Sequence, residues 1–572
     1  MKVFTIALCT FLLSVMAGGA SYGDVDIGKA PVVGASSEFQ FGFHKKQLTA
    51  IQSAKISDLR DGTIWSQIDD ESTGHEGALQ RSAVGELLQN TALVGSVIVF
   101  PQHPDFEGGV TVQTTQGIHA FAEHVASVAS AFPKLPAIEV GNEFNTQSFV
   151  KGPVKALSPL QRADLYAKYL AEIAKQPAVQ GRRILGAATH SIAAGYIWRL
   201  LDQGAAAHMD AVTIHPYTSQ AEQLPRQIEI LRRHPDMAGL DIEMTEFGTT
   251  DFADAPDKFW RMYCTMAMSG VSRAVWYPLR ARGDGYAPLF REDMRMTSVG
   301  RAYLAAQTVA SERDVQLYRP DPFTWGCVFD GKLAVLWGAP RTVSLLRGDL
   351  EVLWADTRVR SSLPELEEKR VLVLKSSGRD LDLDRDLELG PLNLVADSYH
   401  QFDFPPEGSV AHDGDAQGFD RFFRVGQDQV EFITCAGQQE RNVPWFPYLC
   451  AQDGKGGLLH GRGFVLGARH RQPMALVHQY NVNDHHALEA EVGVNMKGQG
   501  SDGVGVSLEH NGQVIDRQIA TGNTVLKFTV VPTVPGDTVS VVLDKNDTMT
   551  GDMGQLRIRL RDAGSDVLKP AQ

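Results

Sequence analysis

Cysteine is scarce in this chain of 572 residues. There are five, and Cys9 falls in an apolar N-terminal segment, which leaves four for the rest of the protein. So few cysteines exclude a fold of this size that is built on disulfide bonds. Cys435 and Cys450 lie in one β-rich segment, where they could pair across adjacent strands or stay as two buried thiols. With 43% hydrophobic residues, the chain must instead rely on a packed core.

Basic clusters are missing as well. Lys and Arg total 54 against 68 Asp and Glu, and the arginines occur as short pairs, such as those at 182 and 232, without a basic stripe. This distribution argues against a nucleic-acid partner. The histidines lack HExxH spacing, so we expect no metal and no other cofactor. The segment 544–552 is rich in oxygen ligands but lacks the EF-hand pattern, and we interpret it as an acidic turn.

The N-terminus carries one short apolar run. Lys2 precedes apolar residues up to about Ala17, and small residues follow near Ala20 and Gly23. The run is shorter than the ~20 residues that span a membrane, so we expect a signal peptide over 1–23, with a membrane anchor as the alternative. The mature protein is then exported, periplasmic or extracellular, and not inserted in a membrane.

Short apolar runs alternate with amphipathic segments between about residues 37 and 310. This pattern is typical of βα units that form a parallel sheet. Eight units that close on each other predict an α/β fold, a (β/α)₈ TIM barrel, over 24–310. The expected strands are 38–44, 56–62, 93–100, 136–143, 183–190, 210–217, 241–248 and 273–279.

The rest of the chain, from about residue 311, shows the pattern of strands without intervening helices. We expect a small β-sandwich side domain over 311–398 and a C-terminal β-sandwich or jelly roll over 399–572. In the latter, Trp445, Phe446 and Tyr448 could form an aromatic platform for sugar rings, or could fill the sandwich core. We expect the protein to be a monomer.

Polar residues gather at the ends of the expected barrel strands. In a TIM barrel the chemistry lies at these carboxyl ends. The residues there are His44, Arg60, Asp61, His103, Asn142, Glu143, His190, His215, Tyr217, Glu246 and Trp276.

Two of these residues are glutamates that closure of the barrel should bring together. Glu143 ends the fourth strand and Glu246 the seventh. Hydrolysis of a glycosidic bond needs one carboxylic acid to protonate the leaving oxygen and a second carboxylate across the anomeric carbon. A separation of ~5–5.5 Å predicts retention of configuration and ~6.5–9.5 Å predicts inversion. Glu139 lies four residues before Glu143, so its side chain should point to the same face of the strand one layer deeper, which suits a supporting role. Glu243 lies three residues before Glu246, so its side chain should point to the opposite face.

These motifs resemble a known group of enzymes. Asn142 and Glu143 ending strand four, with Thr-Glu-Phe-Gly at 245–248 ending strand seven, resemble clan A of the retaining glycoside hydrolases. The segment DLRDGTIWSQID at 58–69 resembles the second strand of family 39 and of related exopolysaccharide-cleaving endoglycosidases, and IHPY at 214–217 resembles their sixth.

The resemblance implies a role for each matching residue. Glu143 would be the acid/base, Glu246 the nucleophile, and Asn142 the group that holds the sugar 2-hydroxyl. His215 and Tyr217 would flank the nucleophile, Arg60 would lie beneath it, and Trp276 would form the apolar floor of the subsite. Burial and the charge of Glu246 should raise the pKa of Glu143, and Arg60 should keep Glu246 ionised.

Two further candidates rest on position alone. His103 could contact sugar from the third strand or be structural, and Trp65 could line the cleft or plug the edge of the barrel. The function expected from all these features is an exported retaining glycoside hydrolase that acts on a polysaccharide, for example a bacterial exopolysaccharide. The alternatives are an exo-acting glycosidase such as a β-xylosidase, and a non-catalytic polysaccharide-binding or assembly protein that kept the barrel.

Overall fold

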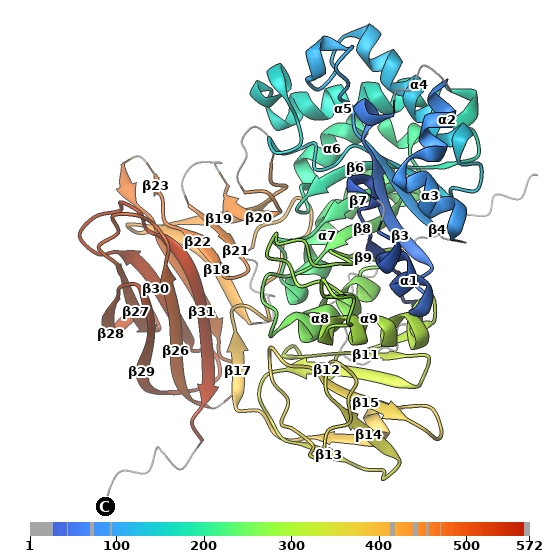
Figure 1. Cartoon of the computed structure of the whole chain (residues 1–572). Coiled ribbons are helices and arrows are strands. Elements are labelled where there is room, and N and C mark those ends of the chain that lie inside the picture. The colour runs from blue at the N-terminus through green and yellow to red at the C-terminus, as the bar shows by residue number, and fades with distance from the viewer. Residues whose placement is uncertain are drawn as a thin grey trace, which may run out of the picture.

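The computed structural model describes residues 27–42, 44–68, 74–91, 94–411, 418–438, 444–452, 457–469, 471–484 and 486–564. The expected signal peptide, 1–23, lies outside these residues. Within them, helices as long and apolar as a membrane crossing requires are not found. The chain forms a barrel, a smaller β-domain beneath it and a large β-region at its side (Figure 1).

The first body is a closed barrel of eight parallel strands, which confirms the predicted fold class. The last strand pairs with the first, Val32 against Arg273, so the sheet has no free edge. The strands are β2 (Val32–Ser36), β3 (Asp58–Thr63), β4 (Val94–Val99), β5 (Ala137–Val140), β6 (Arg183–His190), β7 (Ala211–His215), β8 (Asp241–Phe247) and β9 (Arg273–Trp276).

The first predicted strand is wrong in position. Residues 38–44 alternate like a strand, yet β2 precedes them and Phe39–Phe41 form a 3-10 turn. Glu38 has a φ of 63°, which breaks the extended path. The buried Asp61 carboxylate then accepts the backbone N–H groups of Phe39 at 2.6 Å and Gln40 at 3.0 Å, and these bonds hold the turn.

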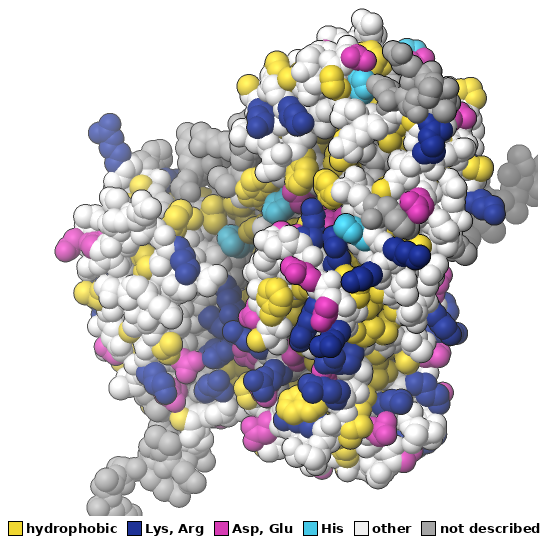
Figure 2. Space-filling model, viewed as in Figure 1, with side chains coloured by type: hydrophobic (Ala, Val, Ile, Leu, Met, Phe, Trp, Pro, Cys, Tyr) yellow, Lys and Arg dark blue, Asp and Glu magenta, His cyan; other side chains and the backbone are white. Residues whose placement is uncertain are grey.

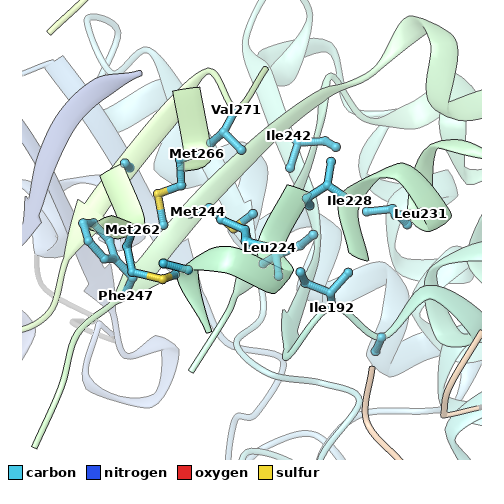
Figure 3. Close-up of a cluster of buried hydrophobic side chains, with 14 of the residues drawn as sticks. Ile192, Leu224, Ile228, Leu231, Ile242, Met244, Phe247, Met262, Met266 and Val271 are labelled. Atoms are coloured by element: carbon cyan, nitrogen blue, oxygen red, sulfur yellow. The ribbon is translucent and has the colours of Figure 1, made fainter. Parts of the chain in front are cut away.

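Helices cover the barrel on the outside. They are α1 (Lys45–Ser53), α2 (Gly74–Arg81), α3 (Ala83–Asn90), α4 (Thr115–Ala131), α5 (Pro159–Ile173), α6 (Ala194–Asp202), α7 (Leu224–Arg232), α8 (Ala255–Met268) and α9 (Ser298–Val309). Ser158 begins α5 with a capping box that it shares with Gln161. Figure 3 shows how β8 packs on the helices: Ile242 and Met244 meet side chains of α7 and α8.

The interior of the barrel contains ion pairs. Near the amino ends of the strands, Arg273 contacts Asp58 at 2.7 Å and Glu243 at 3.3 Å. Nearer the carboxyl ends, Arg60 contacts Glu139 at 2.6 Å. Buried charges of this kind are stable only when they are paired, so each arginine fixes the strands around it.

A six-stranded antiparallel sheet, the side sheet, lies beside α8. Its order is β1 (Ile27–Lys29), β10 (Asp314–Tyr318), β11 (Thr324–Phe329), β12 (Leu333–Gly338), β15 (Leu372–Ser376) and β14 (Leu350–Leu353). Thus the first three described residues belong to this sheet and not to the barrel. A disulfide between Cys264 in α8 and Cys327 in β11 joins the two bodies. A small pair, β13 (Val343–Leu345) and β16 (Leu387–Leu389), completes the domain, and α10 (Leu383–Asp386) lies directly before β16.

The C-terminal β-region, residues 394–564, folds as a sandwich-like β-structure. Its strands are β17 (Leu394–Asp397), β18 (Phe419–Val425), β19 (Asp428–Cys435), β20 (Tyr448–Ala451), β21 (Leu458–His460), β22 (Gly463–Val465), β23 (Ala468–Arg469), β24 (Gln472–Pro473), β25 (Ala475–Asn481), β26 (His486–Met496), β27 (Val504–His510), β28 (Gln513–Ala520), β29 (Asn523–Thr533), β30 (Thr538–Lys545) and β31 (Met553–Asp562). Strand β17 pairs with β31, so it belongs here although its residues were expected in the side domain. The disulfide between Cys435 and Cys450 joins adjacent strands β19 and β20, which decides between the two alternatives.

The three bodies meet at one buried carboxylate. Glu222 of the barrel is 4% exposed. It accepts a hydrogen bond from Trp337 Nε1 of the side sheet at 2.7 Å and one from the Tyr399 hydroxyl of the C-terminal β-region at 2.7 Å. The β-region is therefore docked against the barrel, beside the carboxyl ends of its strands (Figure 1).

Candidate active site

Glu143 and Glu246 lie in one site at the carboxyl ends of β5 and β8. One carboxylate oxygen of each, together with a ring nitrogen of His215, lies within 4.8 Å of the others. His215 Nδ1 is 3.0 Å from Glu143 Oε1 and 3.7 Å from Glu246 Oε2, so it stands between them. Closure of the barrel thus joins two residues that are 103 positions apart in the chain.

The backbone around Glu143 has an unusual conformation. Gly141 has a φ of 69° and Glu143 a φ of 42°, a region that side-chain-bearing residues rarely adopt. Bonds on both sides hold this path: the Gly141 N–H donates to the Val99 carbonyl and the Thr146 N–H to the Glu143 carbonyl, each at 2.8 Å. Such strain is typical of functional positions, because the fold must maintain it at a cost.

Arg60 lies beneath the site and donates hydrogen bonds to three side chains, one of them Glu246. Its Nε donates to Glu139 at 2.6 Å, its Nη2 donates to Asn142 Oδ1 at 2.8 Å, and its Nη1 donates to Glu246 Oε1. The guanidinium is 1% exposed. Burial alone would raise the pKa of Glu139, but the charge of Arg60 and its hydrogen bonds hold it below the ordinary value. The supporting role that parity assigned to Glu139 agrees with these contacts.

The tautomer of His215 follows from its neighbours. Arg60 Nη2 lies 3.4 Å from Nε2, and because a guanidinium can only donate, Nε2 must accept. Nδ1 therefore carries a proton and donates to Glu143. This arrangement makes His215 a link between the arginine below and the acid above.

A second histidine, His190, also contacts Glu143. His190 Nδ1 lies 3.1 Å from the same oxygen, Oε1. Burial raises the pKa of Glu143, but the hydrogen bonds and charges of His190 and His215 outweigh it and lower the pKa to about 2. The expectation that this pKa is raised in the ligand-free protein is therefore wrong: two imidazole donors favour the carboxylate more than burial disfavours it.

Tyr217 is placed against the other glutamate. Its hydroxyl donates to Glu246 Oε2 at 2.8 Å. Burial, and next the charge of Glu246, raises the pKa of Tyr217 well above the ordinary value. The phenol therefore stays protonated and acts as a donor. Glu246 thus accepts one bond at each oxygen, from Arg60 and from Tyr217.

Three predicted substrate contacts lie elsewhere. Trp276 is 0% exposed, donates its Nε1–H to Ala287 at 2.9 Å and meets Phe247 edge-on. Its predicted role as the floor of a subsite is wrong in this structure because the loop after β9 returns over it. Trp65 and His103, both 4% exposed, pack on each other with ring centroids 5.0 Å apart. That burial leaves them almost no surface for sugar, which favours the structural alternative for His103 and the alternative in which Trp65 plugs the edge of the barrel.

Two residues at the site carry no sequence motif that marks their role. His190 is one of many polar residues at the strand ends, and Tyr286 lies outside that set. Tyr286 is half-buried with its ring 5.3 Å from that of Tyr217. A loop tyrosine after the last strand carries no motif, so only the fold places it here. His44, by contrast, precedes α1 and contacts Arg280.

The residues Glu143, His215 and Glu246 could also hold a divalent cation. Their surroundings oppose it. Arg60 donates to Glu246 and Tyr217 occupies its second oxygen, while the proton-bearing Nδ1 of His215 points at Glu143. A cation would have to displace these donors and lie beside a buried guanidinium.

Several solved structures of other proteins are similar to this chain. No protein-family model matches the chain, and no curated protein is significantly similar to it. A family 39 glycoside hydrolase from Bacteroides cellulosilyticus WH2 aligns at 14% identity over 61% of this chain and 81% of its own, with a TM-score of 0.45. A family 39 β-xylosidase from Caulobacter crescentus aligns at 14% identity over 61% and 98%, with a TM-score of 0.43. A family 86 protein in complex with neoagarooctaose aligns at 12% identity over 95% and 100%, also at 0.43. These sequence identities and TM-scores are too low to indicate an activity for this chain. A proposed activity therefore depends on the geometry of the site.

Proposed function

We propose that the protein is a glycoside hydrolase that retains configuration, acting on a polysaccharide such as a bacterial exopolysaccharide. The observation that carries the proposal is the approach of one Glu143 oxygen and one Glu246 oxygen to within 4.8 Å. An upper bound of this size on one pair of oxygens favours the ~5–5.5 Å carboxyl separation of retaining enzymes over the ~6.5–9.5 Å that leaves room for a water in inverting ones.

In the first step Glu246 attacks the anomeric carbon while a proton passes to the leaving oxygen. Arg60 and Tyr217 orient Glu246 and stabilise its charge, so that one carboxylate oxygen faces the sugar. Glu143 delivers the proton. Because the ionised form of Glu143 is favoured when no sugar is bound, Glu143 must take up a proton when the substrate binds, before it can act as the acid.

In the second step water cleaves the glycosyl-enzyme. Glu143, now a carboxylate, takes a proton from the water, and Glu246 leaves as a carboxylate. The low pKa of Glu143 suits this half of the cycle less well than a pKa near neutrality would. Asn142, held by Arg60, is positioned to bind a sugar hydroxyl next to the reacting carbon.

Export is part of the proposal. Two disulfides, Cys264–Cys327 and Cys435–Cys450, occur in the described residues. Disulfides persist in the periplasm and outside the cell and are rare in the cytosol. They support the expectation of a cleaved signal peptide over 1–23.

The test uses wild type, Glu143→Gln and Glu246→Gln on a panel of nitrophenyl glycosides and polysaccharides. We expect Glu246→Gln to lose about ten thousand-fold or more in turnover, on the scale of a lost catalytic triad member. Proton NMR of the first product formed should show the anomeric configuration of the substrate. Unchanged turnover in both variants, or an inverted first product, would overturn the proposal.

A further inference from the structure

The C-terminal β-region extends one loop into the candidate active site. Strands β19 and β20 are joined at their ends by the Cys435–Cys450 disulfide. The loop between them, here called the β19–β20 loop, is described at 436–438 and 444–447. The Gly195 N–H, at the start of α6 in the barrel, donates to the carbonyls of Ala436 at 3.3 Å and Gly437 at 3.1 Å. Gly437 has a φ of 77° and a Cβ there would lie 2.4 Å from the Phe446 carbonyl, so only glycine allows this turn.

A second contact attaches the loop to the segment that carries Glu143. Gln438, 1% exposed, accepts from Asn145 Nδ2 at 2.6 Å and donates to the Asn145 carbonyl at 3.3 Å. Asn145 in turn accepts the His190 N–H at 2.9 Å and donates to the His190 carbonyl at 3.0 Å. Both amide side chains are buried and bonded, so Gln438 holds its described part of the loop against the residues that surround the acid.

The Gln438 N–H also donates to the Pro444 carbonyl at 2.8 Å, so this anchoring places Trp445 beside His190. Their ring centroids are 5.3 Å apart and nearly perpendicular, at 84°. The His190 ring in turn stacks on that of Tyr217, with centroids 6.0 Å apart and planes at 26°. The ring of Tyr217 lies 5.3 Å from that of Tyr286. These four rings are only partly buried, so each keeps some accessible surface. Figure 2 shows hydrophobic, histidine and acidic side chains gathered in the hollow between the barrel and the C-terminal β-region.

Trp445 lies on the side of the site where Glu143 stands. Its ring contacts that of His190, whose Nδ1 contacts Glu143. In the proposed reaction Glu143 protonates the leaving oxygen, so the leaving sugar lies on its side. An indole offers a flat apolar face to the C–H surface of a pyranose.

We propose that Trp445 forms the subsite for the leaving sugar, so that the C-terminal β-region completes the active site of the barrel. The inference rests on the proposed function, and it names the substrate class more narrowly: a glycan with a further sugar on the leaving side of the cleaved bond. Gln438 is a positioning residue, because it acts by holding the loop. The alternative is that Trp445 only seals the contact between the two bodies.

The experiment compares substrates that share the reacting sugar and differ in the leaving group. The probes are the β-fluorides of xylose, glucose and mannose, paired with xylotetraose, cellotetraose and mannotetraose. The variants are Trp445→Ala and Trp445→Phe. The matched control is Trp354→Ala, which removes a tryptophan that is 40% exposed in the side domain.

For the sugar that is hydrolysed, Trp445→Ala should lower kcat/KM about tenfold for the tetraose and change it less than about twofold for the fluoride, whose leaving group is too small to reach the ring. Trp445→Phe should keep most of the tetraose activity, and Trp354→Ala should keep both. Partition of the glycosyl-enzyme to an added acceptor sugar should fall in Trp445→Ala, because the acceptor occupies the same subsite. Equal losses on both substrates would show a merely structural role, and no loss would show no role; either result overturns the inference while leaving the hydrolase proposal standing.

If wild type hydrolyses none of the probes, the proposed function fails for these sugars, and the subsite is judged by binding. The tetraoses are then titrated while the intrinsic fluorescence of the protein is followed. A signal present in wild type and Trp354→Ala but absent in Trp445→Ala supports the subsite. Identical titrations in the three proteins, or no binding by wild type, overturn it.

Discussion

Replacement of Arg60 by methionine should damage stability and activity for separable reasons. The guanidinium is 1% exposed and Glu139, which it neutralises, is 0% exposed. Methionine keeps the apolar stem but leaves that carboxylate without its charged partner. Removing one partner of a buried pair costs about 3–5 kcal/mol. At roughly 2–4 °C per kcal/mol for a body of this size, the unfolding transition should fall by about 6–20 °C.

A second change separates the two effects. Glu139→Gln, added to Arg60→Met, removes the uncompensated charge, so the double variant should regain at least about half of the lost melting temperature. Activity should stay at least about a hundredfold below wild type, because Glu246 and Asn142 still lack their donor. Arg199→Met is the control: Arg199 pairs with Asp164 at the surface, and such pairs contribute ~0–1 kcal/mol.

The measurements are thermal unfolding followed by circular dichroism and hydrolysis of the best substrate in the nitrophenyl panel. A melting temperature for Arg60→Met within about 1 °C of wild type would refute the buried-pair reasoning. So would a double variant that is less stable than the single one. Recovery of activity in the double variant would show that Arg60 is needed only to neutralise Glu139 and not to donate a hydrogen bond to Glu246.

Three other predictions follow from the same site. Tyr217→Phe removes one donor to Glu246 and should lower kcat/KM about ten- to a hundredfold at unchanged melting temperature, the value of a hydrogen bond to a charged group; equal activity would contradict it. The pKa of Glu143 is lowered in the fold from 4.5 to about 2, so its ionised form stabilises the protein above pH 4.5, by about 3 kcal/mol, and this is lost as pH falls towards 2. The melting-temperature gap between wild type and Glu143→Gln should therefore narrow between pH 6 and pH 3, and a constant gap would refute it. Finally, activity should survive EDTA, because Arg60 and Tyr217 already occupy Glu246; loss on chelation with recovery on adding a divalent metal would show that the Glu143, His215 and Glu246 cluster binds one.

The barrel could be predicted from the sequence because its signal is repeated. Apolar strands alternate with amphipathic helices, and parallel strands must present their carboxyl ends on one side. That rule alone brings Glu143, Arg60, His215 and Glu246 into one region. Depth along the strand then separates Glu139 from Glu143, since residues four apart point to the same face but lie in different layers.

What could not be predicted depends on loops and on long-range contacts. The turn at Phe39–Phe41 looks like a strand until the Asp61 carboxylate is seen to bind its backbone. Trp276 is the right residue type for a sugar, but a returning loop buries it. The approach of Gln438 to Asn145 joins positions that are 293 residues apart, and no local pattern encodes it.

The direction in which the pKa of Glu143 is shifted could not be predicted from the sequence either. From the sequence, burial and a neighbouring glutamate predict a raised pKa. The direction reverses because two histidines donate to one oxygen, and hydrogen bonds of this kind favour the charged form. Whether a buried acid is protonated depends on such contacts, which only coordinates reveal.

Covalent trapping tests the site most directly. A 2-deoxy-2-fluoro glycoside with a good leaving group, made from the sugar that the protein hydrolyses, should form a long-lived glycosyl-enzyme, because the fluorine slows the second step. Peptide mass spectrometry should then find one added sugar on the peptide that contains Glu246, and none in Glu246→Gln. A label on Glu143, or full inhibition without any covalent adduct, would contradict the assignment of Glu246 as the nucleophile.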